Sequence, residues 1–186
     1  ENLPAMSSQL DICQRALSDF LEEKRGQFPR FYFIGDDDLL EILGQSKKPE
    51  VIQSHLKKLF AGIHTVVFGE ANKTITALRS MDGEVVNLNA PVEVDEHVEN
   101  WLSKLAEAMK GTLASMLTKC IQLKDYREFP SQILCIADMV HFCSKAEQGI
   151  QQGTLAQYRE TLVAQLQEYT AFDVEGFRVM QLKIQS

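Results

Sequence analysis

The hydrophobic pattern of this 186-residue chain changes its period twice, and that change limits the folds open to it. Apolar residues recur at helical spacing in the first third of the chain and again after Pro91. Between them, the stretch from Thr65 to Leu88 holds three short runs of β-branched residues. Helical spacing predicts amphipathic helices, and such runs predict strands. The predicted fold is therefore mainly α with a small antiparallel β-meander (α+β).

Three segments follow from this pattern. Residues 1–62 are predicted to form a helical segment that includes a short strand at 31–34, where a β-prone aromatic run is expected to be buried on both faces. Residues 63–90 are predicted to form the three-stranded meander, and residues 91–186 a bundle of long helices. We expect all of them to be parts of one region.

Two helices are predicted in the first segment. The first runs from about Ser8 to Arg25, with Ser7 or Ser8 as the N-cap, and ends at Gly26 and Pro29. Its apolar stripe consists of Leu10, Cys13, Leu17, Phe20 and Leu21. The second lies between Pro49 and Gly62, and its stripe consists of Ile52, Leu56, Leu59 and Phe60.

The meander contains a strong turn signal at Asp82-Gly83. This dipeptide is typical of two-residue hairpin turns, in which both central residues adopt positive φ. We therefore expect the second and third strands to form a tight hairpin, and the helical pattern to resume directly at Pro91.

The third segment begins with an unusually long helix, predicted from about Glu96 to Ile121 with Asp95 as its cap. Its length would be about 40 Å, which suits an elongated helical-bundle rod. Its stripe consists of Val98, Trp101, Leu102, Leu105, Met109, Met116 and Cys120. Another helix is expected to start at Pro130, with the stripe Ile133, Ile136, Ala137 and Val140.

A last helix is separated from its predecessor by Gly149 and Gly153 and has Thr154 as its predicted N-cap. Its stripe consists of Leu155, Tyr158, Leu162, Leu166 and Tyr169. The chain begins without methionine and ends while its pattern is still amphipathic, so we expect it to be a piece of a longer protein.

Composition excludes several classes of function. The formal net charge is −7, which argues against non-specific binding to nucleic acid. No apolar run approaches the roughly 18 residues that span a membrane. The four cysteines, Cys13, Cys120, Cys135 and Cys143, form no CxxC pair and are predicted to be buried, reduced thiols. A zinc site around His141 and Cys143 is the weaker alternative.

No catalytic, cofactor-binding or metal-binding residue is predicted. The sequence lacks a GxxxxGK[ST] loop, GxGxxG, HExxH, GxSxG and an EF-hand loop. The mixed run Glu22-Glu23-Lys24-Arg25 is interpreted as a solvated helix face.

Three consecutive aspartates, Asp36 to Asp38, precede an apolar run that ends at Leu43. The favoured interpretation is a helix start, with Asp36 or Asp37 as the N-cap and the other carboxylates in the first turn, where the helix dipole favours negative charge. A docking surface for a basic partner and a metal site remain as alternatives. Calcium sites need six to eight spaced oxygen ligands, which a contiguous triplet seldom supplies.

The stretch "CQRALSDFLEEKRGQFPRFYFIGDDDLLEILGQSKKPEVIQSHLKKLFAGI" resembles the linker region of dynein heavy chains. The residues that match the family motif are Cys13, Leu17, Phe20, Leu21, Lys24, Arg25, Phe28 to Phe33, Asp36, and Leu39 to Leu43. The downstream "EVDEHVENWLSKLAEAMKGTL" also resembles the family. The likeness covers nearly the whole chain and fades near 122–129 and 173–176, where relatives have loops of varying length. Within the family, "FIGDDDLLEILGQS" is most similar to the dyneins of intraflagellar transport.

The resemblance implies a mechanical role. The linker is a helical rod that lies across a ring of six AAA+ modules and bends and straightens as the ring uses ATP and magnesium. It would transmit the power stroke for minus-end-directed movement. Implied partners are the AAA+ ring of the same heavy chain and, through other regions, microtubules and other dynein subunits, with no nucleic acid and no membrane. The implied location is cytoplasm, cytoskeleton and cilium.

Two other functions fit the sequence less well. A helical scaffold or adaptor that docks a protein partner would usually show a repeat of about 34 to 47 residues, and none is visible. An enzyme with an unrecognised site would need titratable groups that converge, whereas the four histidines lie on separate predicted elements. If the chain is a linker, its expected bending points are Gly26 to Pro29, the meander and its flanks, and "KDYREFP".

Overall fold

The computed structural model describes residues 3–46, 48–69, 73–123 and 129–171. The chain divides into two compact units, 1–113 and 114–186, and the division falls within one helix. The described part is mainly helical with one three-stranded antiparallel sheet, so the predicted fold class is confirmed. Of the loop positions expected near 122–129 and 173–176, residues 124–128 and 173–176 lie outside the described residues, and the elongated rod stays a prediction.

Helix α1 spans Leu3–Gln27, so it starts earlier than predicted. Ser7 and Ser8 lie inside the helix and do not cap it. Pro4 lies in the first turn, where a residue without an N–H loses no helical hydrogen bond. At the other end the helix passes through Gly26 and stops just before Pro29.

The predicted strand at 31–34 is wrong, because Pro29–Phe33 forms a 3-10 helix, η1. The amide of Phe31 donates to the carbonyl of Phe28 over 3.0 Å. Residues three apart eclipse one another in such a turn. Phe28 and Phe31 therefore point into the core with ring centroids 5.0 Å apart, whereas Tyr32 and Phe33 are exposed. The aromatic run is buried with a period of three rather than along a whole strand.

Two short helices follow, α2 (Asp36–Gly44) and α3 (Pro49–Leu59). Leu39 and Ile42 of α2 are fully buried. The predicted stripe of the second helix is confirmed, since all its members are buried: Ile52, Leu56, Leu59 and Phe60.

The sheet consists of β1 (Thr65–Phe68), β2 (Thr74–Arg79) and β3 (Val85–Glu93), antiparallel and in that order, which confirms the meander. The expectation of helix from Pro91 onward is wrong, because β3 continues past this proline and Val92 pairs with Ile75. The register shifts between Ile75 and Ala77, opposite the stretch that contains Pro91. A proline is tolerated here because β3 is an edge strand and its pairing is interrupted.

The β2–β3 hairpin turns at Gly83, whose φ is +90° as predicted. The turn is longer than two residues, since the amide of Gly83 donates to the carbonyl of Ser80 over 3.3 Å and Arg79 pairs with Val85. Gly83 is thus the last residue of a turn that starts at Ser80, which corrects the predicted two-residue type.

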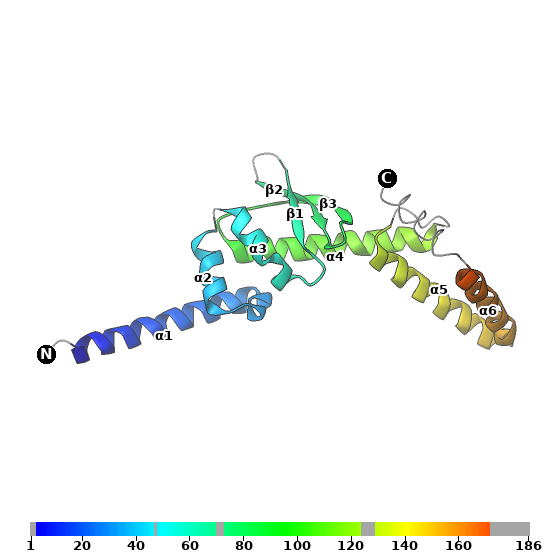
Figure 1. The fold of residues 1–186 in the computed structure, drawn as a ribbon, viewed down its shortest axis with the longest axis horizontal. Helices are drawn as coiled ribbons and strands as arrows, with labels where there is room; N and C mark the ends of the chain where they lie inside the picture. The colour runs from blue at the N-terminus through cyan, green and yellow to red at the C-terminus, as the bar shows by residue number, and fades with distance from the viewer. Residues whose placement is uncertain (1–2, 47, 70–72, 124–128, 172–186) are drawn as a thin grey trace. The chain divides into compact units, whose positions relative to one another are not determined.

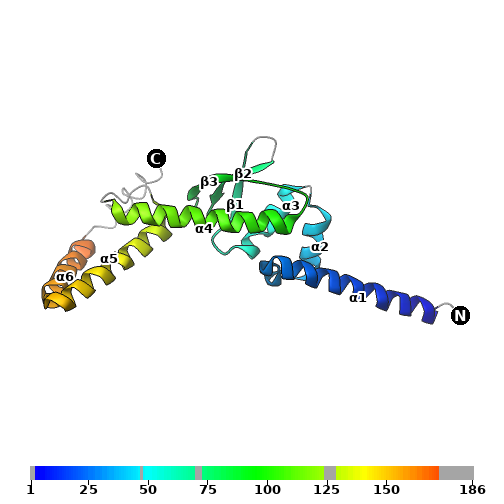
Figure 2. The ribbon, with the colours of Figure 1, turned by 180° about the vertical axis from the view of Figure 1, so that it is seen from behind.

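Helix α4 spans Val98–Gln122, close to the predicted range. Asp95 accepts a hydrogen bond from the amide of His97, just before the helix. In the first unit the leading turns of α4 lie along the sheet (Figures 1 and 2) and bury Trp101, Leu102 and Leu105 in the core that all the other elements of the unit share. We call this shared core the hub. It consists of the buried apolar residues between Leu21 and Ala106, together with the ends of the helices and strands that enclose them.

The second unit contains the end of α4, α5 (Ser131–Gln152) and α6 (Leu155–Ala171). Gly149 does not end the helix, because it lies within α5. A Cβ added at this position would lie 3.3 Å from the backbone of Leu155, so the glycine allows the start of α6 to approach α5 closely. Gly153 ends α5 with a φ of +71°. Val140, Leu155 and Leu166 of the predicted stripes are exposed.

The predicted burial of the cysteines is confirmed for Cys120 alone. Cys13, Cys135 and Cys143 are exposed. For Cys120, burial first and then the charge of Asp138 raise the pKa of the thiol. Among the described helices, none combines the length and the apolarity needed to cross a bilayer.

Candidate functional site

The aspartate triplet occupies the first turn of α2 rather than its cap. Gly35 is the N-cap, with extended backbone and no side-chain capping bond, and its carbonyl accepts the amide of Leu39 over 3.0 Å. The prediction of Asp36 or Asp37 as N-cap is therefore wrong by one or two positions. The carboxylates of Asp36, Asp37 and Asp38 still lie where the helix dipole favours negative charge.

Asp36 connects α2 to the end of α1. Its carboxylate lies 2.6 Å from the guanidinium of Arg25, whose side chain is only 14% exposed. Arg25 also donates to the backbone carbonyl of Ile34 over 3.4 Å. One arginine thus holds both the exit of η1 and the start of α2 against α1.

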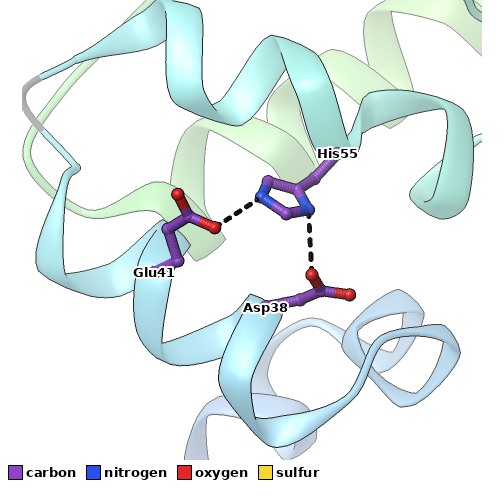
Figure 3. A group of neighbouring side chains, drawn as sticks. All are labelled: Asp38, Glu41 and His55. Carbon is purple, nitrogen blue, oxygen red and sulfur yellow. Dashed lines mark hydrogen bonds and ion pairs between the residues drawn. The ribbon is translucent and has the colours of Figure 1, made fainter.

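Asp38 connects α2 to α3 (Figure 3). Its Oδ2 accepts a hydrogen bond from Lys58 over 2.6 Å, and its Oδ1 lies 3.5 Å from Nδ1 of His55. On the other side of the ring, Nε2 of His55 lies 3.3 Å from Oε2 of Glu41. The hydrogen bond from Lys58 lowers the pKa of Asp38, against a smaller opposing effect of burial.

Asp38, Glu41 and His55 place one ligand atom each within 4.8 Å of one another, a spacing at which three residues can share a cation. Two features favour ion pairing instead. The two ring nitrogens of His55 face different carboxylates, whereas a metal ion would take one nitrogen along its lone pair. The ammonium of Lys58 already neutralises Asp38. The residues therefore fit a charge cluster that ties α2 to α3 better than a metal site.

A buried pair connects α1 to α4. The ammonium of Lys24 lies 2.5 Å from the carboxylate of Glu99, and their side chains are 17% and 6% exposed. Burial acts to raise the pKa of Glu99, but the hydrogen bond from Lys24, with a backbone hydrogen bond and nearby positive charge, leaves it below its ordinary value.

These contacts give the charged run before Gly26 a role that sequence reasoning missed. The sequence pattern suggests a solvated face for Lys24 and Arg25, but they hold α1 to α4 and to α2. A signal was present in the sequence, because both follow the buried Leu21 at the i+3 and i+4 spacing that shares a helix face. The opposite charges, in Asp36 and Glu99, are 11 and 75 residues from their partners.

The charged residues of the described site connect helices to one another and do not form a recognisable active site. The charged residues brought together come from α1, α2, α3 and α4, and each pair closes a junction between helices that enclose one core. His55 lies between the carboxylates of Asp38 and Glu41. That no residue of the chain is catalytic or metal-binding stays a prediction.

Comparisons with known proteins agree with the resemblance. A family model described as "Dynein heavy chain, N-terminal region 2" matches residues 1–120. Proteins described as "Cytoplasmic dynein 2 heavy chain 1" are 50% identical over 191 residues in Chlamydomonas reinhardtii and 50% identical over 182 residues in Homo sapiens, covering 100% and 94% of this chain. A "Dynein heavy chain, cytoplasmic" of Drosophila melanogaster is 35% identical over 177 residues and covers 82% of this chain.

The matches cover most or all of this chain but only a small part of each relative. The chain spans about 4% of the length of each of these relatives. The identity is higher to the two heavy chains described as cytoplasmic dynein 2 than to the Drosophila protein.

Proposed function

The chain belongs to the dynein heavy chain family, and from this premise we propose that it is a mechanical segment of the motor's linker. In this role it transmits conformational change of the AAA+ ring into the power stroke for minus-end-directed movement on microtubules. The matched part is an N-terminal region of the heavy chain rather than the ATPase ring, as expected from the absence of nucleotide-binding motifs. ATP and magnesium would be bound by the ring.

The observation that carries this proposal is the hub. Helices α1 to α4 and the sheet enclose one core, and charge pairs close the junctions α1–α4, α1–α2 and α2–α3. Close-packed interiors resist compression and pass strain between neighbouring elements. An element that transmits force needs such a rigid centre, because a soft centre would absorb the displacement.

The similarity to cytoplasmic dynein 2 heavy chains supports a finer proposal. The segment would act in the dynein of retrograde intraflagellar transport, located in the cytoplasm, the cytoskeleton and the cilium. Its partner would be the AAA+ ring of its own heavy chain, while microtubules and other subunits would bind elsewhere in the motor.

The test uses a complete dynein 2 motor that contains this segment. Trp101 and Leu105 are both buried in the hub. Replacing both by alanine should soften the hub and lower its stability by several kcal/mol, because the loss of a large buried aromatic side chain alone costs about 3–5 kcal/mol. Gliding velocity on microtubules should then fall more than the ATPase rate, because nucleotide chemistry takes place in the ring. Exposed Lys110→Ala is the matched control and should change neither rate.

A proportional fall in both rates would contradict the proposal. Unchanged gliding together with loss of a bound subunit would instead favour the alternative function, a helical scaffold or adaptor that docks a protein partner. ATP turnover by the isolated 186-residue chain would contradict the assignment of this segment as a non-catalytic part.

A further inference from the structure

Arg30 of η1 lies in sequence between two buried phenylalanines, Phe28 and Phe31, and its side chain contacts the end of another helix. Its Nη1 donates a hydrogen bond to the backbone carbonyl of Leu59 over 2.9 Å, across 29 positions of sequence. Its guanidinium carbon lies 4.6 Å from the centre of the Phe60 ring. Arg30 therefore makes a polar and an aromatic contact with the short stretch in which α3 ends.

Both contacts suit an arginine. Leu59 is the last residue of α3, and the final carbonyls of a helix have no partner within it. The negative end of the helix dipole also lies here, so a cation is favoured. The bond is partly buried, which strengthens it relative to one in water. A flat guanidinium can donate to the carbonyl and lie over the ring together, whereas a lysine ammonium has no plane to stack.

The end of α3 is attached to the sheet. Residues 60–64 connect α3 to β1. The amide of His64 in this connection donates to the carbonyl of Arg79, the last residue of β2, over 2.9 Å. The end of α3 is thus joined to β1 by the chain and to β2 by a backbone hydrogen bond. Arg30 contacts the helical end of this connection.

On its other side, Arg30 is attached to α1. The amide of Phe28, just before η1, donates to the carbonyl of Lys24 over 3.1 Å and so continues the helical bonding of α1. Pro29 follows, and its ring fixes the backbone angle φ at the start of η1. A short, hydrogen-bonded backbone therefore joins Arg30 to the last turn of α1.

We propose that Arg30 is a positioning residue that couples the sheet to the end of α1, because it holds η1 against the end of α3. The inference rests on the proposed mechanical function and adds a second route to it. The pair of Lys24 and Glu99 connects α1 to α4, whereas Arg30 connects α1 to α3 and the sheet. A displacement of the sheet then reaches α1 through this contact.

The test compares two arginine-to-lysine changes in a complete dynein 2 motor that contains this segment. Arg30→Lys keeps the positive charge near the end of α3 but loses the plane that donates and stacks together. Arg79→Lys is the matched control, because that side chain is exposed at the end of β2. Hydrogen exchange is measured by mass spectrometry in peptides that cover η1 and residues 60–64. Gliding velocity and ATPase rate are measured on the same motors.

In Arg30→Lys, exchange in these two peptides should rise about tenfold, because the loss of one hydrogen bond to a charged group eases local opening by about that factor. Exchange in α2 should stay parental, and the ratio of gliding velocity to ATPase rate should fall. Arg79→Lys should change none of these. Phe60→Leu should also lower the ratio. Combined with Arg30→Lys, it should lower the ratio no further than the stronger single change, because both residues act at one contact.

Three results would overturn the inference. Exchange that rises equally in α2 would show that Arg30 serves the stability of the whole hub. Effects of Arg30→Lys and Phe60→Leu that add in full would show that they act at separate places. A parental ratio in Arg30→Lys, with a lowered ratio when Trp101 and Leu105 are replaced by alanine, would remove the role of Arg30 alone. A parental ratio in both would contradict the proposed mechanical function as well, so the two failures are distinguishable.

Discussion

Nζ of Lys24 lies 2.5 Å from Oε1 of Glu99. The two residues are 75 positions apart in sequence, and their contact joins α1 to α4. Both side chains are largely removed from water. A charge in such a place is costly unless its partner is present, so the pair acts as a lock between α1 and α4. The other charge pairs of the hub are more exposed on at least one side and contribute less.

The first prediction concerns this lock. Lys24→Met should destabilise the chain by about 3 kcal/mol, because it leaves the carboxylate of Glu99 buried without a cation. Adding Glu99→Gln should restore a part of the loss, since the uncompensated charge is then removed. Lys110→Met removes an exposed i,i+3 partner of Glu107 and should stay within about 0.5 kcal/mol. Urea unfolding measures all three, and a Lys24 variant as stable as the Lys110 variant would contradict the lock.

The second prediction concerns pH. The folded-state pKa of Glu99 lies below its ordinary value of 4.5, so its contribution to stability is present above pH 4.5 and is lost as the pH falls through the folded pKa. In Lys24→Met burial acts without the cation, the pKa of Glu99 rises, and protonation relieves the penalty. The stability difference between the parent and Lys24→Met should therefore shrink as the pH falls from the raised pKa of Glu99 in the variant to its lowered pKa in the parent. A difference that is constant from pH 7 to pH 3.5 would show that Glu99 is not the group affected.

The third prediction separates Asp38 from Asp37. Asp38→Ala should lower the melting temperature more than Asp37→Ala, because it removes the hydrogen-bond partner of Lys58 and leaves the buried His55 with one carboxylate. Asp37→Ala loses mainly the favourable interaction with the helix dipole, about 0.5 kcal/mol. Thermal unfolding compares the two, and equal costs would mean that the α2–α3 contacts do not stabilise the chain.

The same cluster gives a prediction about cations. Millimolar magnesium, calcium or micromolar zinc should not raise the melting temperature, because the ammonium of Lys58 already neutralises Asp38 and the two ring nitrogens of His55 face different carboxylates. A ligand that binds only the folded state must stabilise it, so calorimetric melting is a direct readout. A saturable rise that disappears in Asp38→Ala would establish the metal site that the ion pairing argues against.

The fifth prediction concerns the hairpin. Gly83 has a φ of +90° and an added Cβ would meet no atom within 4 Å, so any cost of Gly83→Val comes from backbone conformation. That cost should be about 1 kcal/mol or more. Gly26→Ala is the matched control, since it also has open space but lies at the end of a helix, where alanine is favoured by up to about 1 kcal/mol. Equal stability of the two variants would refute the turn assignment.

The periodicity of apolar residues predicted much of the fold, because the spacing of these residues within a helix or strand defines the face that it buries. The stripe of α3 and the leading turns of α4 are buried as expected. The failures arise where tertiary contacts decide. The run at 31–34 is β-prone, yet Pro29 and the eclipsed pair of Phe28 and Phe31 favour a 3-10 turn. Strand β3 passes Pro91 because its edge position tolerates an interrupted register.

The charge contacts were out of reach for a different reason. The sequence draws attention to the whole triplet Asp36 to Asp38, but Arg25 and Lys58, the partners of Asp36 and Asp38, lie on other helices. Local spacing shows which residues share a face and does not show which faces meet. Cys13 is exposed for the same reason. The apolar stripe of α1 predicts that this face of the helix is covered, but it does not show which element covers it.

The central claim is that the hub couples α1 to the rest of the segment so that force passes through it. The most direct test measures gliding velocity and ATPase rate in complete motors that carry Lys24→Glu, Glu99→Lys, or both changes together. Each single change places two like charges at the α1–α4 junction, and the ratio of gliding velocity to ATPase rate should fall. The double change restores opposite charges and should recover most of that ratio. If the single variants keep the parental ratio, or the double variant remains as impaired as the single ones, the junction of Lys24 and Glu99 does not transmit the motor's force.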